Sequence, residues 1–382
     1  MKTKLLYVLT FIIATLNVNS QTEVSPFVEN LTEPIKMIAD GTDLYVLGYE
    51  DLYKIDTSTP TPTTTVIYTP EPDHFMYNLT LSESTLYMAI ENYEESTGNF
   101  LGSRIMALDL DNLSSSLELI YSTTEFINAL TINGNTIYFS AETLDNPPNY
   151  EPFTTHIDKI DVSVPNPTAT VIVSDLSDGV AQDIVFYNND LYVSDIDNAT
   201  VHKFNANQIE PTVDNFLINL STPRGLTVLG NELYISANYL LQKIDLDDLS
   251  SDLENVAQNT TYQDETNDGM DFNANFRDVA IIGNTIYMIL EEAGNGRIVS
   301  IVDSSLSVED INTNDVSVLS SNDQIVVNGL LKNTEVKLYD INGKMIIETQ
   351  LSQNHNYIDA KQLTQGIYML KIENSKTFKL VK

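Results

Sequence analysis

Two arginines could form an anion-binding pair, because they occupy the same position in a repeated pattern. Arg224 and Arg277 each lie ten residues before a tyrosine, Tyr234 and Tyr287, that follows a Leu or an Ile. Two neighbouring guanidinium groups can hold a carboxylate, sulfate or phosphate through paired hydrogen bonds. The competing interpretation is that each arginine pairs with a nearby acid, such as Arg277 with Asp278, because paired charges are often structural.

The same interval before four other tyrosines extends this set of candidate residues. It selects Ile35, Tyr77, Asn128 and Gln182, and the residues that follow these are Lys36, Asn78, Ala129 and Asp183. Most of them are polar, although the segments around them are rich in Val, Ile and Leu. We predict that the ligand-binding side chains at the mouth of a channel are Tyr77, Asn128, Gln182, Asp183, Arg224, Arg277 and Asp278. Asp183 is a second acid with which Arg277 could pair instead.

One acidic loop carries oxygen ligands at alternate positions and has a glycine, Gly269, at a sharp turn. It resembles the first half of an EF-hand-type calcium loop. The resemblance implies calcium ligands at Asp264, Thr266, Asp268 and Asp271. The loop departs from the pattern because its twelfth position is Asn275 rather than Glu and because no helical pattern flanks it. A solvated acidic loop is therefore the alternative, and calcium is the only cofactor that we predict.

No recognisable catalytic arrangement accompanies these residues. The sequence has no G-x-S-x-G, H-E-x-x-H or P-loop motif, and its four histidines show no metal-ligand spacing. It has no cysteine, which excludes thiol catalysis, disulfides and thiolate zinc sites. We therefore assign no catalytic residue, and the sequence favours a protein that is not an enzyme.

The elements that position the candidate residues belong to six repeats. An aromatic pair marks each repeat, and the pairs are Leu44-Tyr45, Leu86-Tyr87, Ile137-Tyr138, Leu191-Tyr192, Leu233-Tyr234 and Ile286-Tyr287. Their spacing of 42 to 54 residues is that of a four-stranded propeller blade. The sequence thus predicts an all-β protein, a six-bladed β-propeller followed by a small antiparallel β-sandwich of Ig-like type. An array of β-sandwiches is the alternative for the repeats.

Closing the ring requires one strand from elsewhere in the chain. The sixth repeat lacks a convincing fourth strand, whereas Glu23 to Leu31 is a spare strand-like run. Since an open ring would leave two sheet edges exposed, we predict that this N-terminal run completes the last blade. The joins between second and third strands and between blades vary in length, which favours a binding face at that end of the propeller.

The generic blade pattern is similar to that of gluconolactonase- and regucalcin-like proteins, six-bladed propellers with a metal in the central mouth. The resemblance implies a metal-assisted hydrolase or lactonase as the alternative function. Glu33, Asn128 and Gln182 could replace some of the metal ligands, but Arg224 stands where an Asp is expected. A cation beside a metal opposes its binding.

Charge divides the chain into two parts. Residues 21–313 contain nine basic and 47 acidic residues, a net charge of −38, whereas residues 314–382 contain eight basic and seven acidic ones. A change this sharp predicts a domain boundary near residue 314. An acidic body repels nucleic acid and anionic lipid, so we predict no nucleic-acid partner.

Both ends of the chain look like targeting segments. Residues 1–20 begin with Lys2 and Lys4, continue with an apolar run of about 12 residues and end in Val18-Asn19-Ser20. This is typical of a cleaved signal peptide, since a transmembrane span needs about 20 apolar residues. We therefore predict a protein that is not integral to the membrane.

The C-terminal residues 314–382 resemble the type A sorting domain of the type IX (Por) secretion system of Bacteroidetes. The matching parts are a Tyr-Asp-x-Asn-Gly-Lys hairpin at 339–344, a Leu-x-x-Gly-x-Tyr strand at 363–368 and a basic end. The resemblance implies partners in the secretion and sorting machinery, and a mature protein that is secreted or attached to the outer cell surface. The predicted organisation is a signal peptide at 1–20, a propeller at 21–308, a linker at 309–313 and a sorting domain at 314–382.

Together these features predict an exported propeller that acts as a non-catalytic binding or interaction module. Its ligand would be a polysaccharide, a peptide or a surface partner. The hydrolase or lactonase remains the alternative.

Overall fold

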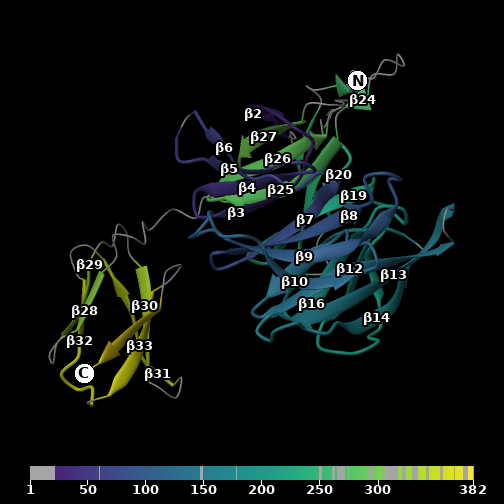
Figure 1. Cartoon of the computed structure of the whole chain (residues 1–382). Helices are drawn as coiled ribbons and strands as arrows, with labels where there is room; N and C mark the ends of the chain where they lie inside the picture. The colour runs from purple at the N-terminus through teal and green to yellow at the C-terminus, as the bar shows by residue number, and fades with distance from the viewer. Residues whose placement is uncertain are drawn as a thin grey trace, which may run out of the picture. The chain divides into compact units, whose positions relative to one another are not determined.

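The chain consists of β-strands wherever the structure describes it, and it divides into two compact units, Met1–Ile301 and Val302–Lys382 (Figure 1). The structure is a computed structural model, and it describes residues 22–381 except for 60, 147–148, 178, 249–251, 260–262, 265–271, 274, 292–295, 304–305, 307–316, 321–323, 329–333, 341–343, 353–355, 365 and 373–376. Within these limits there is no helix of a length and hydropathy suited to crossing a bilayer. The predicted signal peptide and linker 309–313 lie outside the described residues.

Six sheets form the first unit in the described part of the chain, and in each the strands are ordered from the inside outward. The first three blades contain β3 (Pro34–Asp40), β4 (Asp43–Gly48), β5 (Leu52–Asp56) and β6 (Thr63–Tyr68); β7 (His74–Ser82), β8 (Thr85–Tyr93), β9 (Phe100–Asp109) and β10 (Glu118–Thr123); β11 (Leu130–Asn133), β12 (Thr136–Asn146), β13 (Asn149–Asp161) and β14 (Thr170–Ser177). The last three contain β15 (Ala181–Tyr187), β16 (Asp190–Asp195), β17 (Thr200–Asn205) and β18 (Asp214–Leu217); β19 (Pro223–Leu229), β20 (Glu232–Ala237), β21 (Leu240–Asp245) and β22 (Glu254–Gln258); β25 (Asn275–Ile282), β26 (Thr285–Glu291), β27 (Gly296–Val302) and β2 (Ser25–Leu31).

The innermost strands contact one another in sequence, and β25 contacts β3, which closes the ring. The predicted all-β fold of propeller type is therefore confirmed. A separate two-stranded ribbon, β23 (Gln263–Asp264) with β24 (Phe272–Asn273), lies in the join before the last blade.

The N-terminal segment joins two blades. Strand β2 pairs antiparallel with β27 as the fourth strand of the last blade, as the closure argument predicts. The short β1 (Thr22–Glu23) pairs in parallel with β22, the outer strand of the preceding blade. The repeat pattern gave no signal for this second pairing, which extends that blade to five strands.

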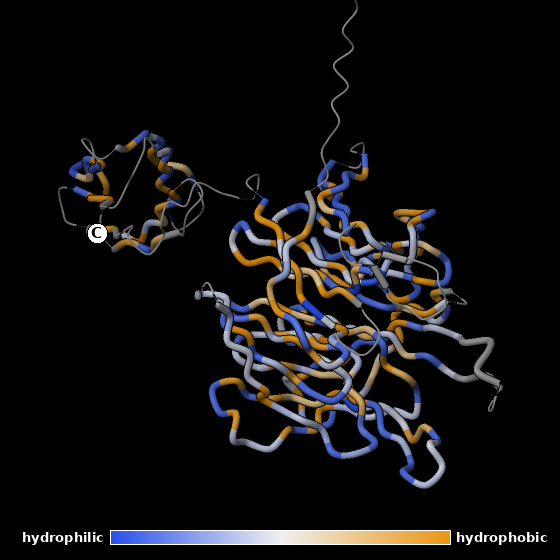
Figure 2. Tube along the Cα trace, turned by 90° about the horizontal axis from the view of Figure 1, so that it is seen from above, coloured by the Kyte–Doolittle hydropathy of each residue, from blue (hydrophilic) through white to orange (hydrophobic). Residues whose placement is uncertain are grey.

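The aromatic markers lie on the second strand of each blade, between two neighbouring strands and two neighbouring blades. The Leu or Ile before every marker tyrosine is completely buried. A strand buried on both faces needs apolar residues at successive positions rather than in alternation, which explains the Leu-Tyr and Ile-Tyr pairs. Figure 2 shows hydrophobic and hydrophilic segments alternating along the trace of this unit.

The second unit contains two small antiparallel sheets. One contains β28 (Ser317–Ser320), β29 (Gln324–Asn328) and β32 (Tyr357–Asp359), and the other contains β31 (Met345–Leu351), β30 (Thr334–Asp340), β33 (Ile367–Ile372) and β34 (Thr377–Val381). Residues of both sheets, including Ile325, Val327, Leu338 and Leu370, form one apolar core. The predicted hairpin is present: Lys344 donates its backbone N–H to Asp340 Oδ1 at 3.0 Å.

Candidate functional site

A bulge interrupts the pairing of every innermost strand at the predicted mouth position. The register between first and second strands shifts by one residue at Ile35, Tyr77, Gln182, Arg224-Gly225 and Arg277. In the third blade the same shift separates the Phe126–Glu142 bridge from the Leu130–Phe139 pair, and Asn128 lies between them. A bulge re-aims the side chain of the extra residue. This explains how an equivalent residue of each blade is directed toward the channel.

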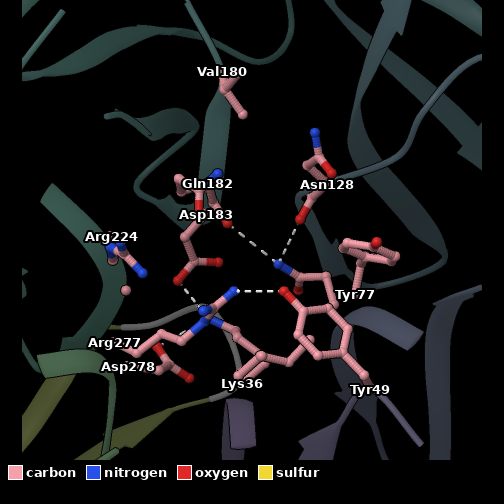
Figure 3. Close-up of a pocket in the computed structure, with 13 residues that line it drawn as sticks. Lys36, Tyr49, Tyr77, Asn128, Val180, Gln182, Asp183, Arg224, Arg277 and Asp278 are labelled. Atoms are coloured by element: carbon pink, nitrogen blue, oxygen red, sulfur yellow. Dashed lines mark hydrogen bonds and ion pairs between the residues drawn. The ribbon is translucent and has the colours of Figure 1, made fainter. Parts of the chain in front are cut away.

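All seven predicted ligand-binding residues line a single cavity of about 190 Å³ (Figure 3). Six further residues complete its lining: Ile35, Lys36, Tyr49, Asn78, Val180 and Gly225. The lining comes from all six blades, because the innermost strands converge at this end of the ring. We call this cavity the mouth cavity. Its lining includes three cationic side chains and two carboxylates.

Lys36 binds both carboxylates. Its amine forms an ion pair with Asp183 of the fourth blade and another with Asp278 of the sixth, the latter at 3.3 Å. The two carboxylates also accept backbone N–H groups, Asp183 from Leu226 and Asp278 from Met37, each at 2.7 Å. This network ties blades together across the channel.

Burial sets the protonation of this network. Burial lowers the pKa of Lys36, but the charges of Asp183 and Asp278 outweigh it, so that the pKa lies above its usual value. Burial raises the pKa of Asp278 to about 7, although Lys36 opposes this rise. The lysine is therefore charged at neutral pH and acts as an ion-pair partner, not as a base.

Arg277 has a different partner from the acids beside it in the sequence. Its Nη2 donates to the Tyr49 hydroxyl at 3.2 Å, and its guanidinium lies 5.8 Å from the centre of the Tyr49 ring. Tyr49 in turn packs edge-on against Tyr77 at 5.3 Å. Because Lys36 binds Asp183 and Asp278, the pairing of Arg277 with either acid is not the arrangement that the ion pairs show.

Amides and hydroxyls fix the remaining backbone at the cavity. Asn78 donates to the carbonyl of Asn128 at 3.0 Å and to that of Gln182 at 3.4 Å, and so links three blades. Ser194 donates to the carbonyl of Arg224 at 2.5 Å, and Ser236 to that of Arg277 at 3.2 Å. These bonds hold the bulged segments in place, so the arginine side chains project from a rigid frame.

Two further carboxyl groups lie beneath the cavity lining. Glu142 accepts a hydrogen bond from Asn128 at 2.7 Å, and burial raises its pKa to about 8. Glu91 accepts one from Tyr93 at 2.6 Å, and burial raises its pKa to about 7. A raised pKa keeps a carboxyl partly protonated near neutral pH, which limits the negative charge close to the mouth.

The predicted calcium loop lies mostly outside the described residues. Thr266, Asp268 and Asp271 fall there, and Asp264 is described only as backbone in β23. Among the side chains that the structure describes, no group of three or more His, Asp or Glu residues is arranged to hold a metal ion. Glu33, which could replace a lactonase ligand, is exposed and does not line the mouth cavity.

The sequence pattern missed Tyr49 and gave Lys36 no role. Lys36 occupies the same repeat position as Asp183 and Asp278, so the offset could have identified it as a cation facing two acids. Tyr49 lies in the join between β4 and β5, where no periodic pattern applies.

The C-terminal unit matches a known family. Residues 319–382 match the model of the secretion system C-terminal sorting domain. No curated protein matches the chain.

Solved structures share the fold of the propeller. A luciferin-regenerating enzyme is similar at 14% identity and a TM-score of 0.51, with 73% of this chain and 95% of that chain covered. A PQQ-bound aldose sugar dehydrogenase from Streptomyces coelicolor has 11% identity and a TM-score of 0.49, with 74% and 97% covered. A chain of a nidogen/laminin complex has 15% identity and a TM-score of 0.46, with 58% and 80% covered. At such identities the similarity shows the fold alone.

Proposed function

We propose that this type IX secretion cargo, exported through its C-terminal sorting domain, binds an anionic group of an extracellular ligand in the mouth cavity of a six-bladed propeller. The protein acts as a binding module, secreted or attached to the surface of a bacterium of the Bacteroidetes kind, and catalyses no reaction. The sorting-domain match at 319–382 supports the export. Six sheets in a closed ring support the number of blades.

The charge balance of the cavity is the observation that carries this proposal. Arg224, Arg277 and Lys36 line a cavity of an otherwise strongly acidic propeller. Lys36 neutralises Asp183 and Asp278, which are almost completely buried. The cavity therefore keeps a positive balance, and a guanidinium fork matches the geometry of a carboxylate or sulfate.

Calorimetric titration of the purified mature protein with sulfate, phosphate and glucuronate tests this function. We expect at least one of these anions to bind, and Arg277→Ala or Arg224→Ala to weaken it by about tenfold or more, since a hydrogen bond to a charged group contributes about 1.5–3 kcal/mol. Arg297→Ala is the matched control, because Arg297 pairs with Glu29 at 3.6 Å away from the cavity. No binding of any anion, or equal affinity in all variants, would disprove the proposal.

The metal-assisted hydrolase or lactonase remains the alternative for the same cavity. Three cationic side chains in the lining oppose a bound cation there. Metal analysis of the purified protein distinguishes the two functions, because the lactonase requires a stoichiometric metal that the Asn128→Ala variant loses.

A further inference from the structure

Four aromatic side chains form a continuous row on the second and third blades. Phe75 packs edge-on against Tyr93 at 5.7 Å, Tyr93 packs against Phe100 at 5.6 Å, and Phe100 stacks on Phe126 at 3.7 Å. We call these four residues the aromatic row. Each ring is partly exposed. Such rings remain available for contact, because none is sealed in the apolar core.

The aromatic row lies at the same end of the propeller as the mouth cavity. Phe75 lies at the start of β7, two residues before Tyr77, and Phe126 lies two residues before Asn128. Tyr93 ends β8 and Phe100 begins β9, so both also belong to this end of the second blade.

Glu91 connects the row to the cavity. It accepts the Tyr93 hydroxyl at 2.6 Å and also interacts with the hydroxyl of Tyr77, a residue of the cavity lining. Tyr77 packs against Tyr49, to which Arg277 donates. Aromatic and polar contacts thus run without a break from the guanidinium of Arg277 to the ring of Phe126.

The size of the cavity limits what it can hold. At about 190 Å³ it is smaller than the roughly 300–1,000 Å³ of pockets that enclose a whole drug-sized ligand. A larger ligand therefore places only its charged end in the cavity, and the rest lies outside it.

The surroundings determine the chemistry of that remaining part. Glu94 and Glu95 are exposed in the join between β8 and β9, beside the row, and repel further negative charge. Flat, partly exposed rings with a negative face attract the weakly positive C–H groups of sugar rings. The part outside the cavity is thus expected to be a neutral carbohydrate.

We propose that the ligand is an oligosaccharide with one acidic end sugar, whose carboxylate enters the mouth cavity while its neutral sugars lie along the aromatic row. This inference rests on the proposed function, since it uses the same arginines for the acidic end. It adds the substrate class and a second contact surface.

Three ligands separate the contributions in calorimetric titrations of the mature chain: glucuronate, neutral cellotetraose and glucuronosyl-cellotriose. We expect glucuronosyl-cellotriose to bind about tenfold or more tightly than either of the others, because each aromatic contact adds about 0.5–1.5 kcal/mol. Phe100→Ala should remove this advantage and leave glucuronate binding unchanged. Arg277→Ala should weaken both acidic ligands.

Two further variants serve as controls. Phe100→Leu keeps an apolar side chain of similar size but removes the ring, so it tests the row if Phe100→Ala fails to fold. Tyr239→Ala removes an exposed aromatic ring from the join between β20 and β21, outside the row, and should change nothing.

The outcomes distinguish failure of this inference from failure of the proposed function. Equal affinity for glucuronate and glucuronosyl-cellotriose, with both lost in Arg277→Ala, overturns the aromatic row and leaves anion binding intact. Binding of no anion at all, in any variant, overturns both. An unchanged advantage in Phe100→Leu also overturns the role of the row.

Discussion

Lys36 is the residue whose loss should affect the mouth cavity most. Replacing it by Met leaves Asp183 and Asp278 buried without their cation. Removing one partner of a buried pair costs about 3–5 kcal/mol. We expect Lys36→Met to lower the free energy of unfolding by about this amount in urea titrations at pH 8.

An exposed pair gives the comparison for that variant. Lys54 lies 2.7 Å from Asp43, and its side chain is 38% exposed. Exposed ion pairs contribute about 0–1 kcal/mol, so Lys54→Met should be nearly neutral. Equal effects of the two variants would show that the Lys36 network does not stabilise the propeller.

His156 makes stability depend on pH. Its Nδ1 lies 3.0 Å from Asp158 Oδ1 and its Nε2 3.0 Å from Glu125 Oε1. The hydrogen bond to Asp158, opposed by burial and aided by Glu125, raises its pKa from 6.5 to about 9. The protonated ring is favoured in the folded state, so its contribution is complete below about pH 6.5 and is lost as the pH rises through 9.

We expect the free energy of unfolding to fall by about 1–2 kcal/mol between pH 6 and pH 9.5, after allowance for solvent screening. His156→Gln should flatten this part of the profile, measured by urea titration at each pH. His74→Gln is the control, because the ring of His74 lies 2.9 Å from a backbone carbonyl, that of Pro72. A profile that stays as steep in His156→Gln would assign the loss to other groups.

At the scale of elements, β2 closes the ring. It provides the outer strand of the last blade and buries Val28 and Leu31. Removing residues 21–31 leaves β27 as an exposed edge and removes these side chains from the core. We expect the melting temperature to fall by at least about 10 °C, since burying two such side chains contributes about 1.5–3 kcal/mol each.

Removing only residues 21–23 provides the control for this deletion. It deletes β1, which pairs with β22 through two residues, and should change the melting temperature by a few degrees at most. If both deletions have the same small effect, β2 is not required for closure.

At the scale of the whole molecule, the two units have separate roles. The sorting domain addresses the chain to the secretion machinery, and the propeller carries the mouth cavity. Deleting residues 314–382 should therefore leave a folded propeller that accumulates in the periplasm. Fractionation of a bacterium with a type IX system, followed by immunoblotting, measures this; normal export of the truncated protein would refute the role of the tail.

Much of the architecture followed from the sequence alone. The recurring Leu-Tyr and Ile-Tyr pairs report strands buried on both faces, and burial of this kind repeats once per blade. The fixed interval from each tyrosine to the mouth residue reflects a hairpin of constant length. That is why Arg224, Arg277 and their equivalents could be placed in one cavity before the fold was known.

Only the tertiary structure decided how those residues interact. Lys36 and Asp183 are 147 residues apart, and their contact exists because the ring brings the first and fourth blades together across the channel. The bulges turn the mouth side chains inward, and the pairing of Tyr49 with Arg277 depends on a join without periodicity. A repeat determines equivalent positions, whereas the partner of each side chain depends on closure, and closure is a property of the whole ring.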